Sequence, residues 1–208
     1  MSRELGPVRW IGATTLGAAV GVTVSTVLAG TPGRSLSAVA GGALVVLGFG
    51  AIIGLVLGAS QVLALPRGVL PWQMWTLATL IGAAFGFGAA AAVGELLGNA
   101  IDPTISVAVG GAAIQITSGA AVGLGVGGAQ SLVLRRSLRG AGGWWILSTV
   151  LGAGLGYGAA IGVLELFDVP ILKANVILSF GAILGLFIGV AQGLVLWSRG
   201  RRLAPAPS

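Results

Sequence analysis

The sequence predicts an all-α integral membrane protein with six transmembrane helices, and three observations support this prediction. The 208 residues are 56% hydrophobic and only 8% charged, whereas soluble domains carry roughly 25% charged residues. The mean hydropathy is +1.03. The charged residues divide the chain into apolar runs that lack the alternation of apolar and polar residues found in membrane β-barrel strands. This composition excludes a soluble globule, which needs a charged surface, and a disordered chain, which is poor in apolar residues.

Six charge-free runs are each long enough to cross a bilayer once and too short to cross it twice. A helix needs about 20 apolar residues to span a hydrocarbon core of roughly 30 Å. The runs contain 24, 32, 27, 32, 25 and 25 residues. They cover residues 10–33, 35–66, 68–94, 103–134, 140–164 and 174–198. Turn-forming glycine or proline residues lie between consecutive runs, so we expect six helices in one membrane domain that covers residues 1–208.

The distribution of basic residues predicts that both termini are cytoplasmic. Nine of the eleven basic residues lie in the N-terminal segment, the second and fourth loops and the C-terminal tail. The opposite side has two basic residues, Arg34 and Lys173, and four of the five acidic ones. The excess of arginine marks the cytoplasmic side, which makes residues 199–208 a cytoplasmic tail. All six tryptophans lie near the cytoplasmic ends, and from this we predict interfacial positions for Trp10, Trp75 and Trp145.

The odd-numbered and even-numbered runs each repeat a pattern of their own three times. The odd runs share Trp-x3-Thr-x2-Gly-x3-Gly, in which the threonines are Thr14, Thr79 and Thr149. The even runs share Gly-x3-Gly-Leu-x2-Gly-x2-Gln-x-Leu-x-Leu. The three glycines of each even run are Gly50, Gly54 and Gly58; Gly119, Gly123 and Gly127; and Gly181, Gly185 and Gly189. We therefore expect three homologous helical hairpins, at about 10–65, 72–134 and 144–198, arranged with pseudo-threefold symmetry.

The spacing within the even runs predicts a helix face made of small residues. Positions i, i+4, i+8 and i+11 lie on one face of a helix, so three glycines lead to a glutamine near the cytoplasmic end. Apolar surface gives membrane helices little reason to associate, because lipid tails are equally apolar. Small residues promote association by letting two backbones approach closely. We expect odd and even helices to pack through these glycine and threonine faces, as in a glycine zipper.

Gln61, Gln130 and Gln192 occupy equivalent positions and form a predicted polar ring. A primary amide in hydrocarbon must find hydrogen-bond partners. One interpretation is that each glutamine bonds a neighbouring backbone or a tryptophan indole N–H and locks helices together. The other is that the three amides line a hydrophilic vestibule or a ligand site. The first interpretation is favoured, because polar residues often link membrane helices in this way.

The segments Gly189-Val190-Ala191-Gln192-Gly193-Leu194-Val195-Leu196 and Gln130-Ser131-Leu132-Val133-Leu134-Arg135-Arg136 carry a resemblance to a known group of sequences. They resemble uncharacterised bacterial multi-pass membrane proteins with a repeated glycine-rich Gln-Trp-Leu-Val-Leu-Arg-Arg signature. The residue after each glutamine here is Val62, Ser131 or Gly193 instead of tryptophan. The resemblance implies a bacterial cytoplasmic membrane and the same repeated architecture, and it implies no activity, cofactor or ligand.

Charged residues near the ends of the runs can be explained without a catalytic or binding role. Glu95 and Glu165 lie at matching places, twenty residues after Trp75 and Trp145. They could form a cation or proton entry site, but we interpret them as water-exposed residues that end the third and fifth helices. The cytoplasmic arginines predict contact with anionic lipid. Nucleic acid is not an expected partner, because short loops cannot match a groove.

We expect no enzymatic activity, no cofactor and no metal site. The chain contains no histidine and no cysteine, and no run has an ionisable residue near its midpoint. The leading prediction is a non-catalytic component that packs with other membrane proteins or lipids, because the eighteen or so small stripe positions exceed what six helices would need. The alternative is a small-solute channel or the substrate-binding subunit of a transporter, since six helices of this size resemble the vitamin-binding subunits of energy-coupling-factor transporters in architecture.

Overall fold

The computed structural model describes residues 7–30, 38–64, 71–100, 107–137, 140–167 and 174–200. These contain six helices long and apolar enough to cross a membrane, which confirms the predicted all-helical, six-span class. The helices are α1 (Pro7–Gly30), α2 (Ala38–Ala64), α3 (Trp72–Ala100), α4 (Val107–Ser137), α5 (Gly142–Leu166) and α6 (Ala174–Gly200). The predicted turns at 31–33, 66–68, 102–103 and 169–170, Arg34, Asp168, Lys173 and most of the basic tail lie outside the described residues.

The helices extend beyond several ends of the charge-free runs. α1 begins at Pro7 instead of residue 10, because proline has the right φ and needs no hydrogen-bond acceptor in a first turn. α3 continues to Ala100, so Glu95 does not end it, whereas Glu165 is the penultimate residue of α5. Charged side chains near helix ends reach polar surroundings, so a helix can continue past the point where the apolar sequence stops.

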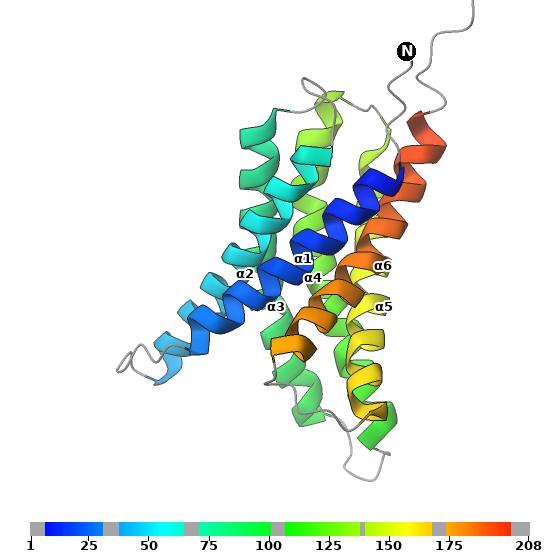
Figure 1. The fold of residues 1–208 in the computed structure, drawn as a ribbon. Coiled ribbons are helices and arrows are strands. Elements are labelled where there is room, and N and C mark those ends of the chain that lie inside the picture. The colour runs from blue at the N-terminus through cyan, green and yellow to red at the C-terminus, as the bar shows by residue number, and fades with distance from the viewer. Residues whose placement is uncertain are drawn as a thin grey trace, which may run out of the picture.

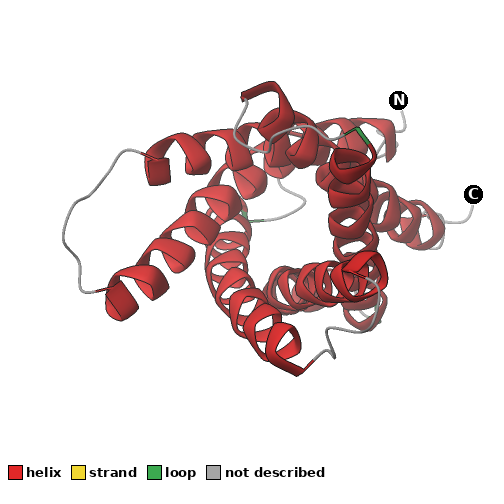
Figure 2. Cartoon of the chain, turned by 90° about the horizontal axis from the view of Figure 1, so that it is seen from below, coloured by secondary structure: helices red, strands yellow, loops and turns green. Residues whose placement is uncertain are grey.

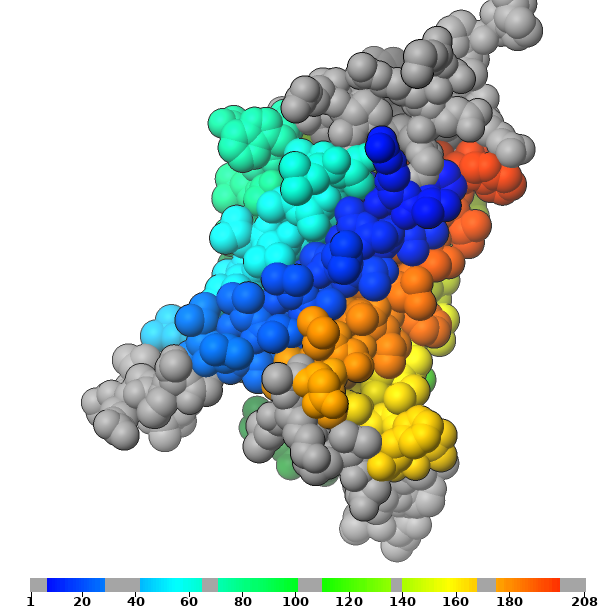
Figure 3. Space-filling view, viewed as in Figure 1, coloured from blue at the N-terminus to red at the C-terminus, as the bar shows by residue number. Residues whose placement is uncertain are grey.

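The six helices form a closed ring in chain order. Each helix packs against the helices before and after it in sequence, and α6 returns to pack against α1. Figure 2 shows this ring along its axis, and Figure 3 shows α1 and α6 side by side on one face. α1 begins and α6 ends at the same end of the bundle (Figure 1).

A glycine with a left-handed backbone conformation lies just before α5. Gly140 has a φ of 79°, in the left-handed region that other residues rarely adopt. The Ala141 carbonyl then accepts a hydrogen bond from the Trp145 backbone N–H at 2.9 Å, and the Pro71 carbonyl accepts the matching bond from Trp75 at 3.0 Å. Both helices therefore begin about one turn before a tryptophan, which places those two indoles at the same end of the ring.

Candidate functional site

Gln61, Gln130 and Gln192 meet inside the ring near the end at which the chain starts. They come from α2, α4 and α6, and all three side chains are completely buried. The sequence predicted that they would share a level. The structure adds that they are in direct contact with one another.

The three amides form a closed circle of hydrogen bonds, which we call the glutamine ring. Gln61 Nε2 donates to Gln192 Oε1 at 3.3 Å, and Gln192 Nε2 donates to Gln130 Oε1 at 3.3 Å. Gln130 Nε2 completes the circle by donating to Gln61 Oε1 at 2.9 Å. Each amide thus uses one N–H group and one oxygen lone pair in hydrogen bonds to the other two amides.

Three tryptophan indoles occupy the second lone pair of each amide oxygen. Trp10 Nε1 donates to Gln192 Oε1 at 3.3 Å. Trp75 does the same to Gln61 at 3.1 Å, and Trp145 to Gln130 at 2.9 Å. An indole N–H can only donate, so each tryptophan requires the amide oxygen, and not the nitrogen, to face it. This sets the direction in which the hydrogen bonds run around the ring.

Threonine hydroxyls accept the remaining N–H group of each amide. Gln61 Nε2 donates to Thr14 Oγ1 at 3.3 Å, and the corresponding bonds to Thr79 and Thr149 are 2.9 Å long. The Thr79 and Thr149 hydroxyls in turn donate to carbonyls of their own helices, at 2.8 and 2.7 Å. Both donors and both acceptor positions of every amide are therefore occupied by protein atoms.

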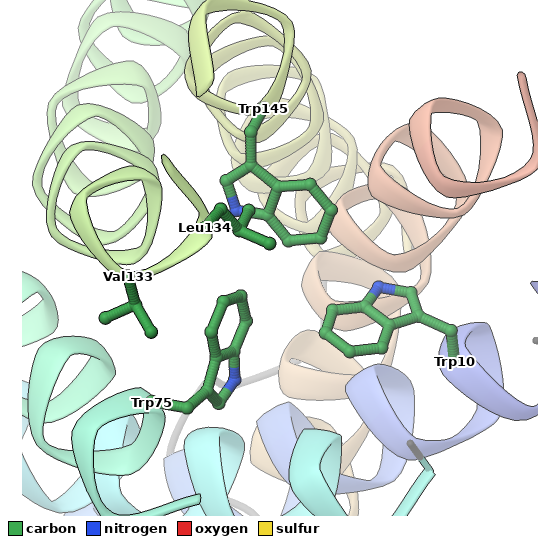
Figure 4. Close-up of a cluster of buried hydrophobic side chains, with 5 residues drawn as sticks. All are labelled: Trp10, Trp75, Val133, Leu134 and Trp145. Carbon is green, nitrogen blue, oxygen red and sulfur yellow. The ribbon is translucent and has the colours of Figure 1, made fainter. Parts of the chain in front are cut away.

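The indoles themselves pack into a tight group, the tryptophan cluster of Trp10, Trp75 and Trp145. Their ring centroids lie 5.6–5.9 Å apart, and their planes are inclined by 70–73°. This is the edge-to-face geometry that aromatic pairs prefer. The three rings point toward one another beside Leu134 and Val133 (Figure 4).

The tryptophan cluster corrects the interfacial prediction for these three residues. Trp10, Trp75 and Trp145 are 3%, 0% and 1% exposed, so they do not face a lipid headgroup region. The outward-facing tryptophans are instead Trp72, Trp144 and Trp197, which are 48–61% exposed. An indole suits both settings, because its ring is apolar and its N–H needs a partner. Here the glutamine oxygens supply that partner inside the ring.

The predicted glycine faces of the even helices lie against the odd helix of the next hairpin. A Cβ atom added at Gly54 or Gly123 would lie 2.5 Å from the carbonyl oxygen of Thr79 or Thr149, and one at Gly185 would lie 2.7 Å from that of Thr14. The other glycines of each face meet the same neighbouring helix. These are Gly50 and Gly58 against α3, Gly119 and Gly127 against α5, and Gly181 and Gly189 against α1. Larger residues at these positions would force the backbones apart.

The six glycines of the repeated pattern in the odd helices face the even helix of their own hairpin. A Cβ atom at Gly21 would lie 3.1 Å from the Ile53 Cα atom, and one at Gly86 would lie 3.0 Å from the Val122 Cα atom. The remaining four, Gly17, Gly82, Gly152 and Gly156, meet α2, α4, α6 and α6. The expectation of surplus small positions for partners is therefore wrong, because the ring uses all fifteen of these glycines.

The sequence interpretation missed a second polar contact between helices. The Ser25 hydroxyl on α1 donates to the Phe49 carbonyl on α2 at 3.2 Å, and the Ser118 hydroxyl on α4 donates to the Ala90 carbonyl on α3 at 3.4 Å. Ser25 and Ala90 lie fifteen residues after the tryptophans, while Phe49 and Ser118 lie twelve before the glutamines. The two contacts are thus made at the same pair of positions, with the serine donor on the odd helix in one and on the even helix in the other. An alignment of the repeated sequence patterns that included serine would have indicated them.

Outside the glutamine ring and the tryptophan cluster, the described residues contain few groups that could bind a ligand or take part in a reaction. Glu95 and Glu165 are exposed on the outer surface of the bundle. No group of three potential metal ligands occurs among the residues that the structure describes. The chain matches no protein-family model, and no curated protein and no solved structure gives a significant match to it.

Proposed function

We propose that this protein is a non-catalytic multi-pass component of the bacterial cytoplasmic membrane that packs against other membrane proteins or lipids. The observation that carries the proposal is the fully bonded glutamine ring. Its amides hydrogen-bond to one another, to the indoles and to the threonines, so each donor and acceptor is already engaged within the protein. This supports a role in locking the helices together over a role in binding a solute.

The proposed architecture is three homologous hairpins around a pseudo-threefold axis, a glycine zipper built in triplicate. Each glutamine is bonded by the tryptophan of the following hairpin and bonds the threonine of its own hairpin, and this linkage recurs three times. The separations between the three indoles are nearly equal. The even-helix glycine faces all meet an odd helix of the following hairpin. Both regularities support the repeat boundaries predicted from the sequence.

Lipids and membrane proteins are the proposed partners, contacted through the outer surface of the ring. Large apolar side chains project outward there, as Leu16, Phe85 and Leu155 do with 67%, 69% and 53% of their surface exposed. Arg9 and Arg135 are exposed at the end where the chain starts, which supports contact with anionic lipid at a cytoplasmic face.

The proposed orientation, with both termini cytoplasmic, predicts the labelling of single cysteines. The natural chain contains no cysteine, so each introduced thiol is the only target. With Glu165→Cys we expect reaction with a membrane-impermeant maleimide in intact cells, because residue 165 is exposed at the outer end of α5. With Ser208→Cys we expect reaction only after the cells are permeabilised. The reverse pattern would show that the termini lie outside.

The accessory role is tested by extracting the protein from its native membrane without detergent. Native mass spectrometry of polymer-bounded lipid particles is expected to find the chain with a fixed complement of other membrane proteins or anionic lipids. A lone chain with neither would contradict the proposal.

The transport alternative is tested with the purified chain in sealed vesicles. We expect solute flux no higher than in vesicles without protein. Flux above that level, lost when Gln61, Gln130 and Gln192 are changed to leucine together, would instead support a channel or transporter.

A further inference from the structure

The contact between α6 and α1 closes the ring without any help from chain connectivity. The other five neighbouring pairs are consecutive helices, whereas α6 and α1 are the last and the first. Side-chain and backbone complementarity alone must therefore hold this contact. Figure 3 shows the two helices packed along their length.

This contact has the same composition as the two contacts between consecutive hairpins. Gly185 faces the Thr14 carbonyl, as Gly54 faces Thr79 and Gly123 faces Thr149. The polar link is also the same: Trp10 donates to Gln192, just as Trp75 donates to Gln61. All three even helices thus present the same kind of surface, a glycine face that ends in a glutamine.

An odd helix presents the complementary surface, also in all three places. The carbonyl of its threonine lies against the middle glycine of the glycine face, where there is no room for a Cβ atom. Its tryptophan lies one turn earlier and donates the indole N–H to the glutamine oxygen. The glycines and the glutamine of the even helix, and the tryptophan and the threonine of the odd helix, recur at the same spacing in all three hairpins.

We infer that the helical hairpin is the unit of assembly. The glycine face of any even helix can pack against the odd helix of any hairpin that carries the same tryptophan and threonine. The inference rests on the proposed three-hairpin architecture and extends it from a pattern to an assembly rule. The order in which the three hairpins are connected is then not needed for the ring to form.

Circular permutation of the complete chain tests this rule. One permuted chain begins at residue 68 and ends at residue 67, and a second begins at 140 and ends at 139. The natural segments 201–208 and 1–6 become the linker, whose fourteen residues can extend to roughly 45 Å. Each permutation moves whole hairpins, so every helix keeps its direction across the membrane.

We expect both permuted chains to be monomeric in the detergent that keeps the natural chain monomeric. Their near-ultraviolet circular dichroism should retain the signal of the tryptophan cluster, and their unfolding midpoints should lie within about 4 °C of the natural value. If either chain lacks that signal both with the natural linker and with a linker lengthened by glycine and serine, the inference is wrong.

Matched glycine substitutions make the comparison sharper. In the natural chain Gly185→Ala disturbs the unlinked contact, and in the chain that begins at 68 the unlinked contact is that of Gly54. We expect Gly185→Ala in the first and Gly54→Ala in the second to lower the midpoint equally, within about 2 °C. Gly162→Ala is the control in both chains, because a Cβ atom there meets nothing within 4 Å. Unequal losses would show that the α6–α1 contact is special.

The outcome is independent of the proposed function. Flux and partner composition are measured on the natural chain and do not depend on chain order. Failure of the permuted chains would leave the accessory role standing, and flux in vesicles would leave the assembly rule standing.

Discussion

Changing Gln130 to leucine is expected to lower the free energy of unfolding by about 3 kcal/mol. Gln130 takes part in four hydrogen bonds, donating to Gln61 and Thr79 and accepting from Trp145 and Gln192. Leucine leaves the Trp145 indole and one N–H of Gln192 buried without an acceptor. Each orphaned buried donor costs about 1–3 kcal/mol, and the modest energies of hydrogen bonds between membrane helices favour the lower part of that range.

The measurement is reversible unfolding in mixed micelles with increasing sodium dodecyl sulfate, followed by indole fluorescence. Gln115→Leu is the matched control, since it makes the same chemical change in the same helix at a partly exposed position. We expect no loss of stability from the control. Equal effects of the two substitutions would mean that the glutamine ring contributes nothing specific to stability.

Replacing all three glutamines together should cost about half the sum of the three single replacements. Each single change orphans two donors, one indole and one amide, which makes six over the three variants. The triple change removes every amide and orphans only the three indole N–H groups. Groups that share one network are expected to be non-additive in this way. Additive losses would show that the three amides act independently.

Changing Gly123 to alanine is expected to destabilise the protein by about 2 kcal/mol, within the range for overpacking a tight contact. The added Cβ atom would lie 2.5 Å from the Thr149 carbonyl oxygen and 2.7 Å from the Val150 Cα atom. Both neighbours are backbone atoms, so no side-chain rotation relieves the clash. α4 and α5 must move apart, which also strains the nearby hydrogen bond between Trp145 and Gln130.

Gly128→Ala in the same helix is the control, and the expected effect has the opposite sign. A Cβ atom there meets nothing within 4 Å. Alanine is a better helix former than glycine by up to about 1 kcal/mol, so this variant should be slightly more stable. The same micelle titration measures both variants. If Gly123→Ala is also stabilising, the close approach of α4 and α5 is not needed for the fold.

Much of the fold follows from local chemistry and could be predicted from the sequence. Hydrocarbon selects long apolar helices, so six charge-free runs predicted six helices, and errors at the ends arose where a helix continues into polar surroundings. α3 passes Glu95 in this way. Helical periodicity also placed Gly119, Gly123, Gly127 and Gln130 on one face, because that depends only on residue spacing.

The direction in which the tryptophans point was decided only by the tertiary structure. A tryptophan near a helix end satisfies its N–H equally well at a lipid headgroup or at a buried acceptor. Trp72 and Trp75 stand three residues apart, yet the first is 61% exposed and the second fully buried. The difference is that Gln61 approaches from α2 to accept the indole proton, which no spacing within α3 could reveal.

The sequence by itself determined which side chains each helix could offer, and the tertiary structure determined which neighbour receives them. A glycine face is equally suited to the odd helix before it or after it along the chain. The even helices pack this face against the odd helix that follows, and the odd helices pack the glycines of their own repeated pattern against the even helix that follows. With every contact made in the same sense around the helices, all three amides meet at the centre, where they bond in a circle. A closed circle requires three helices to meet, so no property of a single segment could have specified it.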